Sequence, residues 1–242
     1  MEIALEKFSK QIKVSSYECN VNKEIKISCI FQHFSEIAWE HIKITGYGFE
    51  GDENSKYKWV LIKVFVNITK IPKWEDVLTI KTWPTGIKAN FFNRDFVIED
   101  SDSNELVYAT SEWAVVDKTL NCIVVPVELE FFRQPKHQSS SNFLFNKIRN
   151  NKNLFPINKE TAGFTDIDLH KHVNNSVYVR WIENCIGNIH PRRINSFKIH
   201  YVNEVFENDE VVIFGERNDN NMFYEGQING GKLCFKSEVN LY

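Results

Sequence analysis

Residues 166–185 read DIDLHKHVNNSVYVRWIENC, and this stretch decides the fold. Its first half alternates four ionisable residues, which are Asp166, Asp168, His170 and His172. Successive side chains of an extended chain point to opposite faces, so alternate residues share a face. The spacing therefore predicts an extended segment with four polar groups on one side.

A helix is predicted directly after this segment. Asn174 or Asn175 supplies the N-cap. Apolar residues then recur at the helical period, namely Val177, Tyr178, Trp181, Ile182 and Cys185. The unpaired N–H groups of the first helical turn should therefore lie beside the acidic and imidazole groups.

Composition limits the class of protein. The chain has 242 residues, enough for one large domain or two of about 120. Hydrophobic residues make up 43% and charged residues 25%, which excludes a disordered chain. The net charge is −3 and no long Lys/Arg block is present, so nucleic-acid binding is excluded as well. The aromatic content of 14% fits either a large apolar pocket or a β-rich core.

The cysteines and the N-terminus predict a cytoplasmic location. The five cysteines are odd in number and scattered, and they include no Cys-x-x-Cys pair, which fits a reducing compartment. The first eight residues, MEIALEKF, show neither a signal pattern nor a transit pattern. No apolar run approaches the roughly 18 residues needed to cross a bilayer, so we expect no membrane span.

The chain repeats one plan twice, a helix followed by strands, although the residues themselves do not repeat. In the first half a helix is predicted over 31–44 and strands near 57–69, 76–84, 90–100 and 105–117. In the second half a helix is predicted over 174–187 and strands near 195–204, 209–215, 222–228 and 232–241. The pattern alone predicts an α+β protein. Polar, turn-rich segments separate the halves, so we predict an N-terminal domain over 1–130, a linker over 131–158 and a C-terminal domain over 159–242.

The motif D-x-D-x-H-x-H-V-N-N-x-x-Y-x-x-W, ending at Trp181, resembles the signature of acyl-acyl-carrier-protein thioesterases, the fatty-acyl chain-terminating hydrolases of plants and bacteria. Upstream segments look like the N-terminal half of the same enzymes, in the same order: IPKWEDV, TWPTG, NRDF and SEWAVVD. The resemblance implies a tandem (double) hotdog fold, in which an antiparallel sheet wraps a central helix in each half. It also implies hydrolysis of fatty acyl-acyl carrier protein, with no metal and no cofactor.

The resemblance also implies the catalytic residues. Asp168 and His172 match the family motif, and His170 stands where the family has Asn. Glu204 joins them because the segment FKIHYVNEV, residues 197–205, aligns with a later Tyr-x-x-Glu-Cys segment of the family. Val205 replaces the cysteine of that segment, so we predict direct attack by water instead of a thiol nucleophile.

The expected roles follow from the chemistry of thioester hydrolysis. Glu204 or His172 takes a proton from water, and Asp168 fixes an imidazole or the water. Backbone N–H groups near Asn174 and Asn175 hold the carbonyl oxygen as negative charge develops on it. The sequence leaves the choice of base between Glu204 and His172 open.

By resemblance, the first half holds the acyl chain. Six apolar strand residues are predicted to line its tunnel: Trp59, Val64, Val66, Phe91, Phe92 and Trp113. For any one of them, an ordinary core position is the better interpretation. We also expect a homo-oligomer, as a dimer, and the sequence does not predict the chain-length preference.

Three alternatives stay open. His170 and His172 with a nearby carboxylate have the ligand types of a zinc or iron hydrolase, which would need a further ligand such as His200. A second alternative is a protein that binds an acyl thioester without cleaving it. The third keeps the reaction but changes the carrier to coenzyme A. A basic rim would instead favour the acidic carrier protein, and five basic residues lie near the motif in sequence: Lys171, Arg180, Arg192, Arg193 and Lys198.

Overall fold

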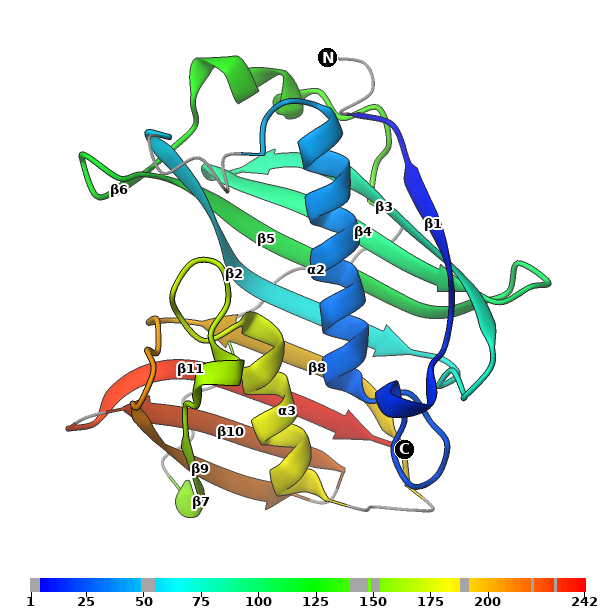
Figure 1. Ribbon diagram of the computed structural model, residues 1–242, viewed down its shortest axis with the longest axis vertical. Helices are drawn as coiled ribbons and strands as arrows, with labels where there is room; N and C mark the ends of the chain where they lie inside the picture. Colours follow the sequence, from blue (N-terminus) through cyan, green and yellow to red (C-terminus); the bar gives the residue numbers. More distant parts are fainter. Residues whose placement is uncertain are drawn as a thin grey trace. The chain divides into compact units, whose positions relative to one another are not determined.

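The computed structural model describes residues 5–48, 55–139, 148, 153–187, 192–218, 220–228 and 230–242 (Figure 1). The chain divides into two compact units. Unit 1 comprises Met1–Val64 and Thr69–Leu144, and unit 2 comprises Phe65–Ile68 and Phe145–Tyr242. Each unit consists of one long helix and an antiparallel sheet.

Unit 1 contains the longer helix, α2. Its elements are β1 (Phe8–Lys13), the 3-10 turn η1 (Ser16–Glu18), α2 (Ile27–Ile44), β2 (Tyr57–Ile68), β3 (Val77–Lys88), β4 (Phe91–Glu99), β5 (Glu105–Asp117), β6 (Cys122–Val124) and the 3-10 turn η2 (Val127–Arg133). The strand order is β1-β3-β4-β5-β2, with β6 paired to β5. The last four residues of β2 belong to unit 2.

Helix α2 lies across one face of the unit 1 sheet because its apolar residues share one side (Figure 1). Ile30, Phe34 and Ile37 are almost completely buried, and the rings of Phe34 and Phe96 on β4 are 4.7 Å apart. On the opposite face of the sheet, Lys81 of β3 pairs with Glu99 of β4 at 2.7 Å. That face is not wholly exposed, since Trp83, Val97 and Tyr108 form a separate buried cluster on it.

Unit 2 repeats this arrangement with a shorter helix. Its elements are β7 (Phe155–Thr161), the 3-10 turn η3 (Phe164–Asp166), α3 (Asn175–Ile186), β8 (Ile194–Tyr201), β9 (Glu210–Asn218), β10 (Asn221–Ile228) and β11 (Lys232–Leu241). The strand order is β8-β11-β10-β9-β7. Tyr178 and Trp181 of α3 are buried, and the Tyr178 ring packs edge-on against Phe235 at 5.7 Å. Gly226 is required beside that ring, because a Cβ there would lie 2.1 Å from a Phe235 ring carbon.

The structure confirms both predicted helices, and strands occur in all eight predicted regions. Helix α2 begins four residues earlier than predicted, at Ile27. Three strands were not predicted: β1 has few buried side chains, β6 has only three residues, and β7 contains Pro156. Strand β7 begins at Phe155, so the last residues of the predicted linker are strand. Residues 140–147 and 149–152 of that linker lie outside the described residues.

Candidate active site

Residues Ile167–Val173 form a tight hairpin just before α3, which we call the site hairpin. An isolated antiparallel bridge pairs its two end residues. The Asp168 N–H donates to the His172 carbonyl at 3.0 Å, and the Lys171 N–H donates to the Asp168 carbonyl at 3.0 Å. The prediction of an extended segment is therefore wrong. The chain reverses because Lys171 adopts a left-handed conformation, with φ of 67°.

The reversal separates Asp166 from the other three ionisable residues. Its carboxylate is buried, accepting a 2.6 Å hydrogen bond from Arg180 of α3 and a 3.1 Å bond from the Gly163 N–H. The Asp166 carbonyl also accepts the Asn174 N–H, at 2.9 Å. Asp166 thus fastens the hairpin to the start of α3 instead of facing a substrate.

His172 lies between two carboxylates. Its Nδ1 is 3.8 Å from Asp168 Oδ1 and its Nε2 is 3.7 Å from Glu204 Oε1. The side chains of Asp168 and His172 are 17% and 21% exposed, while Glu204 is 41% exposed and faces solvent. Both distances exceed a direct hydrogen bond and suit bridging by water. Three of the four predicted catalytic residues are therefore adjacent.

The fourth predicted residue, His170, has an exposed side chain at the edge of this group. Its ring stacks on that of His172, with centroids 5.7 Å apart and planes 21° from parallel. Its backbone N–H donates to Asp168 Oδ1 at 2.8 Å, an Asx-type turn that fixes the carboxylate. His170 therefore contributes through its backbone, and its imidazole is available on the outer side of His172.

The start of α3 distinguishes the two asparagines. Asn174 is the N-cap, because its Oδ1 accepts the Ser176 N–H at 3.0 Å. Its own N–H is used by Asp166. Asn175 is the first helical residue, and no described group accepts its backbone N–H. Because the helix dipole favours negative charge at this end, the Asn175 N–H is the donor available to a substrate oxygen.

Two tyrosines support the site, the buried Tyr178 and the half-buried Tyr201, and neither was predicted to have a site role. The Tyr201 hydroxyl donates to the Asn175 carbonyl at 3.0 Å. Burial raises the pKa of Tyr178 far above its usual value, and the nearby charges of Glu204 and Asp168 raise it further. Burial also raises the pKa of Tyr201. Both phenols therefore stay protonated. The signal for Tyr201 was its place in the same segment as Glu204.

Among the described residues of unit 2, neither Cys185 nor Cys234 has a thiol suited to act as a nucleophile, because burial raises the pKa of both. The Val205 side chain is buried, and its carbonyl accepts the Val173 N–H at 2.8 Å, tying the Glu204 segment to the site hairpin. Cys185 lies near the end of α3, and burial raises the pKa of its thiol to about 11. A thiol with this pKa is almost entirely protonated and unreactive at neutral pH.

Within the described residues, no group of three or more His, Cys, Asp or Glu side chains is arranged to hold a metal ion. His200 lies on β8, in register with Lys236 of β11. Arg180 forms an ion pair with Asp166, and Lys198 forms one with Glu238 at 2.9 Å. Lys171 is exposed on the site hairpin.

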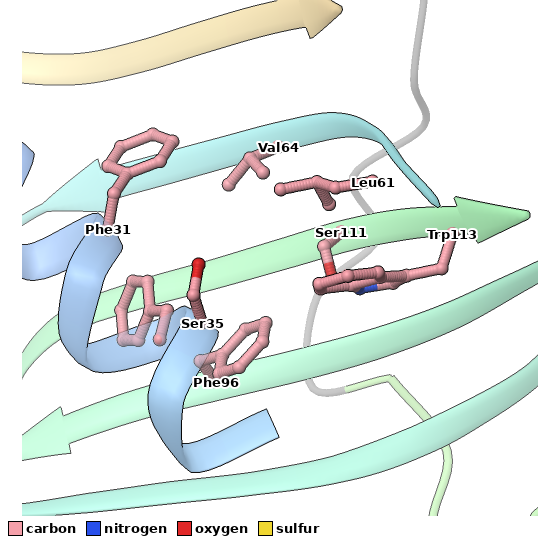
Figure 2. A pocket seen from close by; sticks show the side chains of 8 residues that line it. Phe31, Ser35, Leu61, Val64, Phe96, Ser111 and Trp113 are labelled. Carbon is pink, nitrogen blue, oxygen red and sulfur yellow. The ribbon is translucent and has the colours of Figure 1, made fainter. Parts of the chain in front are cut away.

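A narrow pocket lies between α2 and the sheet of unit 1 (Figure 2). It is lined by Phe31, Phe34 and Ser35 of α2, by Leu61 and Val64 of β2, by Phe96 of β4, and by Ser111 and Trp113 of β5. Two of the six predicted acyl-chain residues, Val64 and Trp113, are among them. The pocket is tight, because only about 10 Å³ of it is open to the centre of a water-sized group.

The other four predicted acyl-chain residues lie elsewhere. Phe92 is buried in an aromatic cluster, with the Trp59 ring edge-on to it at 4.9 Å. Val66 is fully buried in the part of β2 that belongs to unit 2. Phe91 is partly buried at the start of β4. None of these four lines the unit 1 pocket.

Comparison with solved structures identifies the fold as a double hotdog. An acyl-ACP thioesterase from Bacteroides thetaiotaomicron superposes with a TM-score of 0.86 at 22% identity, covering 98% of both chains. The 12:0-ACP thioesterase of Umbellularia californica superposes with a TM-score of 0.84 at 19% identity, covering 98% of this chain and 97% of that one.

The sequence then defines the family. Residues 5–133 match the acyl-ACP thioesterase N-terminal domain, and residues 151–234 match the acyl-ACP thioesterase C-terminal domain. The chain belongs to the acyl-ACP thioesterase family. The chloroplastic palmitoyl-acyl carrier protein thioesterase of Arabidopsis thaliana is 27% identical over 217 residues, which are 81% of this chain and 52% of that protein. The chain thus spans about half the length of the curated relatives that it matches.

Proposed function

We propose that this protein hydrolyses the thioester of fatty acyl-acyl carrier protein and releases free fatty acid and the carrier thiol. The observation that supports this most directly is the position of His172 between Asp168 and Glu204, just before the N-terminus of α3. Family membership adds the substrate class, since the matched domains are those of acyl-ACP thioesterases.

In the proposed reaction, a water molecule hydrogen-bonds to Glu204 and to His172 Nε2 and attacks the thioester carbon. One water proton passes to Glu204 or His172 as the new C–O bond forms. The Asn175 N–H stabilises the oxyanion of the tetrahedral intermediate. The C–S bond then breaks, and the leaving thiolate takes a proton from the protonated base or from water. Asp168, held by the His170 N–H, orients the imidazole through Nδ1.

This mechanism needs no covalent acyl-enzyme. Val205 occupies the place of the cysteine that follows the family glutamate, and Cys185 is a half-buried thiol whose pKa is raised to about 11. The carboxylate at Glu204 is exposed to solvent, so water reaches it directly. Attack by water therefore fits the groups that the site contains.

The location and the assembly of the protein belong to the same proposal. We propose a cytoplasmic location, which agrees with five cysteines in the thiol form. Among the described residues, no helix combines the length and the apolar composition that a membrane crossing requires. We further propose a homodimer, for which the exposed Phe155 on the edge strand β7 offers apolar surface.

The test is thiol release from acyl-acyl-carrier-protein and acyl-coenzyme A substrates of graded chain length, with a chelator present. We expect turnover, with higher kcat/KM on the carrier-protein substrates. Glu204→Gln should lower kcat by about 10²-fold or more. The matched control is Glu207→Gln, which alters an exposed glutamate of the same loop and should leave kcat unchanged.

Each other outcome identifies an alternative. Higher kcat/KM on coenzyme A substrates would indicate that the substrate is acyl-coenzyme A instead of acyl-acyl carrier protein. Binding of acyl thioesters without thiol release would indicate a binding protein. Activity that disappears with the chelator and returns with zinc or iron would indicate a metal hydrolase. Equal activity of Glu204→Gln and the wild-type protein would overturn the role of Glu204.

A further inference from the structure

The start of α3 is held by hydrogen bonds on both sides of the Asn175 N–H. Before it, the Asn174 N–H donates to the Asp166 carbonyl at 2.9 Å. After it, the Ser176 N–H donates to the Asn174 side chain at 3.0 Å. The Asn175 carbonyl accepts the Tyr201 hydroxyl at 3.0 Å. The residue that carries the proposed oxyanion donor is therefore fixed through its neighbours and through its own carbonyl.

The bond from Tyr201 is additional to the hydrogen bonds of the helix. In an α-helix the carbonyl of each residue accepts the N–H four residues later. A carbonyl oxygen has two acceptor positions, so the Asn175 carbonyl can accept the Tyr201 hydroxyl as well. Helix α3 would keep its own bonds without this hydroxyl. What the hydroxyl contributes is a connection between the first turn of α3 and strand β8.

The ring of Tyr201 is itself held in place. It packs edge-on against the ring of Tyr178, with centroids 5.6 Å apart. Tyr178 lies three residues after Asn175 in α3, so the two residues are neighbours on the helix surface. Tyr178 is 3% exposed, and its ring also packs edge-on against Phe235 at 5.7 Å. The Tyr201 hydroxyl therefore has little freedom to leave the Asn175 carbonyl.

The segment between Tyr201 and Glu204 is tied to β11. The Asn203 side chain donates to the Leu233 carbonyl at 2.7 Å, and the Asn203 N–H donates to the Cys234 carbonyl at 3.3 Å. Tyr201 thus belongs to the same fixed segment as the carboxylate of the proposed base. One side chain therefore links this segment to the residue that carries the proposed oxyanion donor.

We propose that Tyr201 is a positioning residue, which holds the Asn175 N–H in the orientation that the oxyanion needs. This inference rests on the proposed function, because it takes that N–H to be the oxyanion donor. Tyr201 acts through the Asn175 carbonyl and not on the substrate. Burial raises the pKa of Tyr201 well above its usual range, so the hydroxyl stays protonated and remains a donor. A donor is effective only at about 2.7–3.1 Å from the oxyanion, so a small rotation of the peptide lowers the rate.

The first measurement is thiol release by Tyr201→Phe, which removes the hydroxyl and keeps the ring that packs on Tyr178. The kcat should fall by about 10- to 10²-fold, because the donor is retained but is no longer fixed. The KM should not change, because the lost interaction acts in the transition state.

The matched control is Tyr224→Phe, which alters another tyrosine of unit 2. Tyr224 is on β10 and is 4% exposed, and its hydroxyl donates to Met222 Sδ at 3.3 Å. The variant therefore also removes a hydroxyl and a hydrogen bond from unit 2. It should leave both kcat and KM unchanged.

The second measurement is the binding of two inhibitors, which does not depend on turnover. One is an acyl trifluoromethyl ketone, whose hydrate has the tetrahedral carbon of the intermediate. The other is an alkyl thioether of the same length, which has no carbonyl oxygen. Tyr201→Phe should weaken binding of the ketone by about the factor by which it lowers kcat/KM, since both report the transition state. Binding of the thioether should not change.

The outcomes distinguish this inference from the proposed function. A kcat of Tyr201→Phe equal to that of the wild-type protein would overturn the positioning role. An equal loss of affinity for both inhibitors would overturn it as well, because it would show a general disturbance of the structure. Absence of thiol release by the wild-type protein with every substrate would overturn the proposed hydrolysis. A selective loss of ketone affinity in Tyr201→Phe would then still support Tyr201 as the residue that orients the Asn175 N–H.

Discussion

The site hairpin of unit 2 has a counterpart in unit 1 that lacks its catalytic residues. Residues Cys19–Ile25, which we call the first hairpin, have the same length as Ile167–Val173. Each hairpin is closed by an isolated antiparallel bridge between its end residues. Each follows a 3-10 turn and precedes the long helix of its unit, α2 or α3. The repeated plan in the sequence thus extends to the site itself.

The hydrogen bonds across the two hairpins correspond one to one. The Asn20 N–H donates to the Glu24 carbonyl at 2.8 Å, as the Asp168 N–H does to the His172 carbonyl at 3.0 Å. The Asn20 side chain accepts the N–H two residues later at 2.8 Å, as the Asp168 side chain does at 2.8 Å. Asn and Asp are interchangeable in this turn because both carry the same acceptor oxygen.

The turn conformation is repeated as well. Lys23 has φ of 60° and Lys171 has φ of 67°, so both hairpins reverse through a left-handed lysine. The residues at the two tips, Val21 and Leu169, are 87% and 94% exposed. A left-handed conformation is unfavourable for lysine, so the surrounding hydrogen bonds must hold it.

Each hairpin is also fastened by a buried acid at the end of the preceding 3-10 turn. Glu18 accepts a 2.6 Å hydrogen bond from His33 of α2, and Asp166 accepts a 2.6 Å bond from Arg180 of α3. Both acids also accept a backbone N–H from the start of their turn. The supporting chemistry is thus conserved between the units, although the residue types differ.

The units differ at the positions that carry chemistry. Asn20 and Glu24 stand where unit 2 has its carboxylate and imidazole. The Ile25 N–H donates to the Pro72 carbonyl, as the Val173 N–H donates to that of Val205, so Ile71 stands where unit 2 has Glu204. Ile71 is buried and cannot act as a base. The two units thus share the backbone geometry, and in the proposed function the activity depends on the three side chains that unit 2 places on it.

The largest expected effect comes from giving the site hairpin the asparagine that the first hairpin has at the corresponding position, Asn20. Asp168→Asn keeps the acceptor for the His170 N–H but loses the charge beside His172 Nδ1, so kcat should fall by about 10²- to 10⁴-fold. The midpoint of thermal unfolding should change little. The measurement is steady-state thiol release together with a thermal scan.

The reciprocal change, Asn20→Asp, serves as the control for this experiment. It introduces a carboxylate in the first hairpin, whose described residues include no imidazole. The kcat of Asn20→Asp should equal that of the wild-type protein. If the two exchanges lowered kcat equally, catalysis would not be confined to the unit 2 hairpin.

The second effect concerns the buried acids. Arg180→Met leaves the Asp166 carboxylate, which is 9% exposed, without its cation. The free energy of unfolding should fall by about 1–3 kcal/mol. The kcat should fall by less than in Asp168→Asn, because Asp166 acts on the site through the N-cap Asn174. Urea denaturation and thiol release measure the two quantities.

His33→Leu is the matched change in unit 1, since it removes the hydrogen-bond donor from Glu18, whose side chain is 8% exposed. It should lower the free energy of unfolding by a similar amount and leave kcat unchanged. A loss of stability without any loss of kcat in Arg180→Met would show that Asp166 has no influence on the helix terminus.

The sequence predicted both long helices and three residues of the candidate site. It did not predict the hairpin at residues 167–173, for a clear physical reason. The helical period gave both helices, and the motif identified Asp168, His172 and Glu204, which the structure brings together. The alternation of ionisable residues was taken for a strand, but the turn at Lys171 decided the local conformation. A period of two over seven residues does not reveal a left-handed residue in its middle.

Contacts between distant residues were beyond the sequence pattern. Asp166 was placed on one face with Asp168, His170 and His172, because spacing does not reveal that Arg180 reaches it. Tyr201 was missed because its bond to Asn175 depends on how β8 packs against α3. The first hairpin was overlooked because its residues differ from those of the site hairpin, whereas its backbone hydrogen bonds are the same.

The smallest expected effect comes from the helix N-caps, because only one of the two long helices has a side chain that caps its first turn. The N-cap of α2 is Lys26, which is extended, with φ of −68° and ψ of 142°, and whose side chain caps no N–H. Asn174 caps α3 through its side chain. Lys26→Asn should therefore raise the free energy of unfolding by about 0.5–1 kcal/mol, and Asn174→Ala should lower it by about 1 kcal/mol.

Activity separates these two cap variants further. Asn174→Ala removes the side chain that caps α3. The N–H of Asn175, the proposed oxyanion donor, then loses its fixed position, so kcat should also fall. Lys26→Asn loses an exposed bond from its Nζ to the Tyr17 carbonyl and should leave kcat unchanged. Urea denaturation and thiol release of both variants measure this. A fall of kcat in Asn174→Ala no larger than that in Lys26→Asn would remove the helix terminus from the mechanism and leave His172 with its two carboxylates as the whole site.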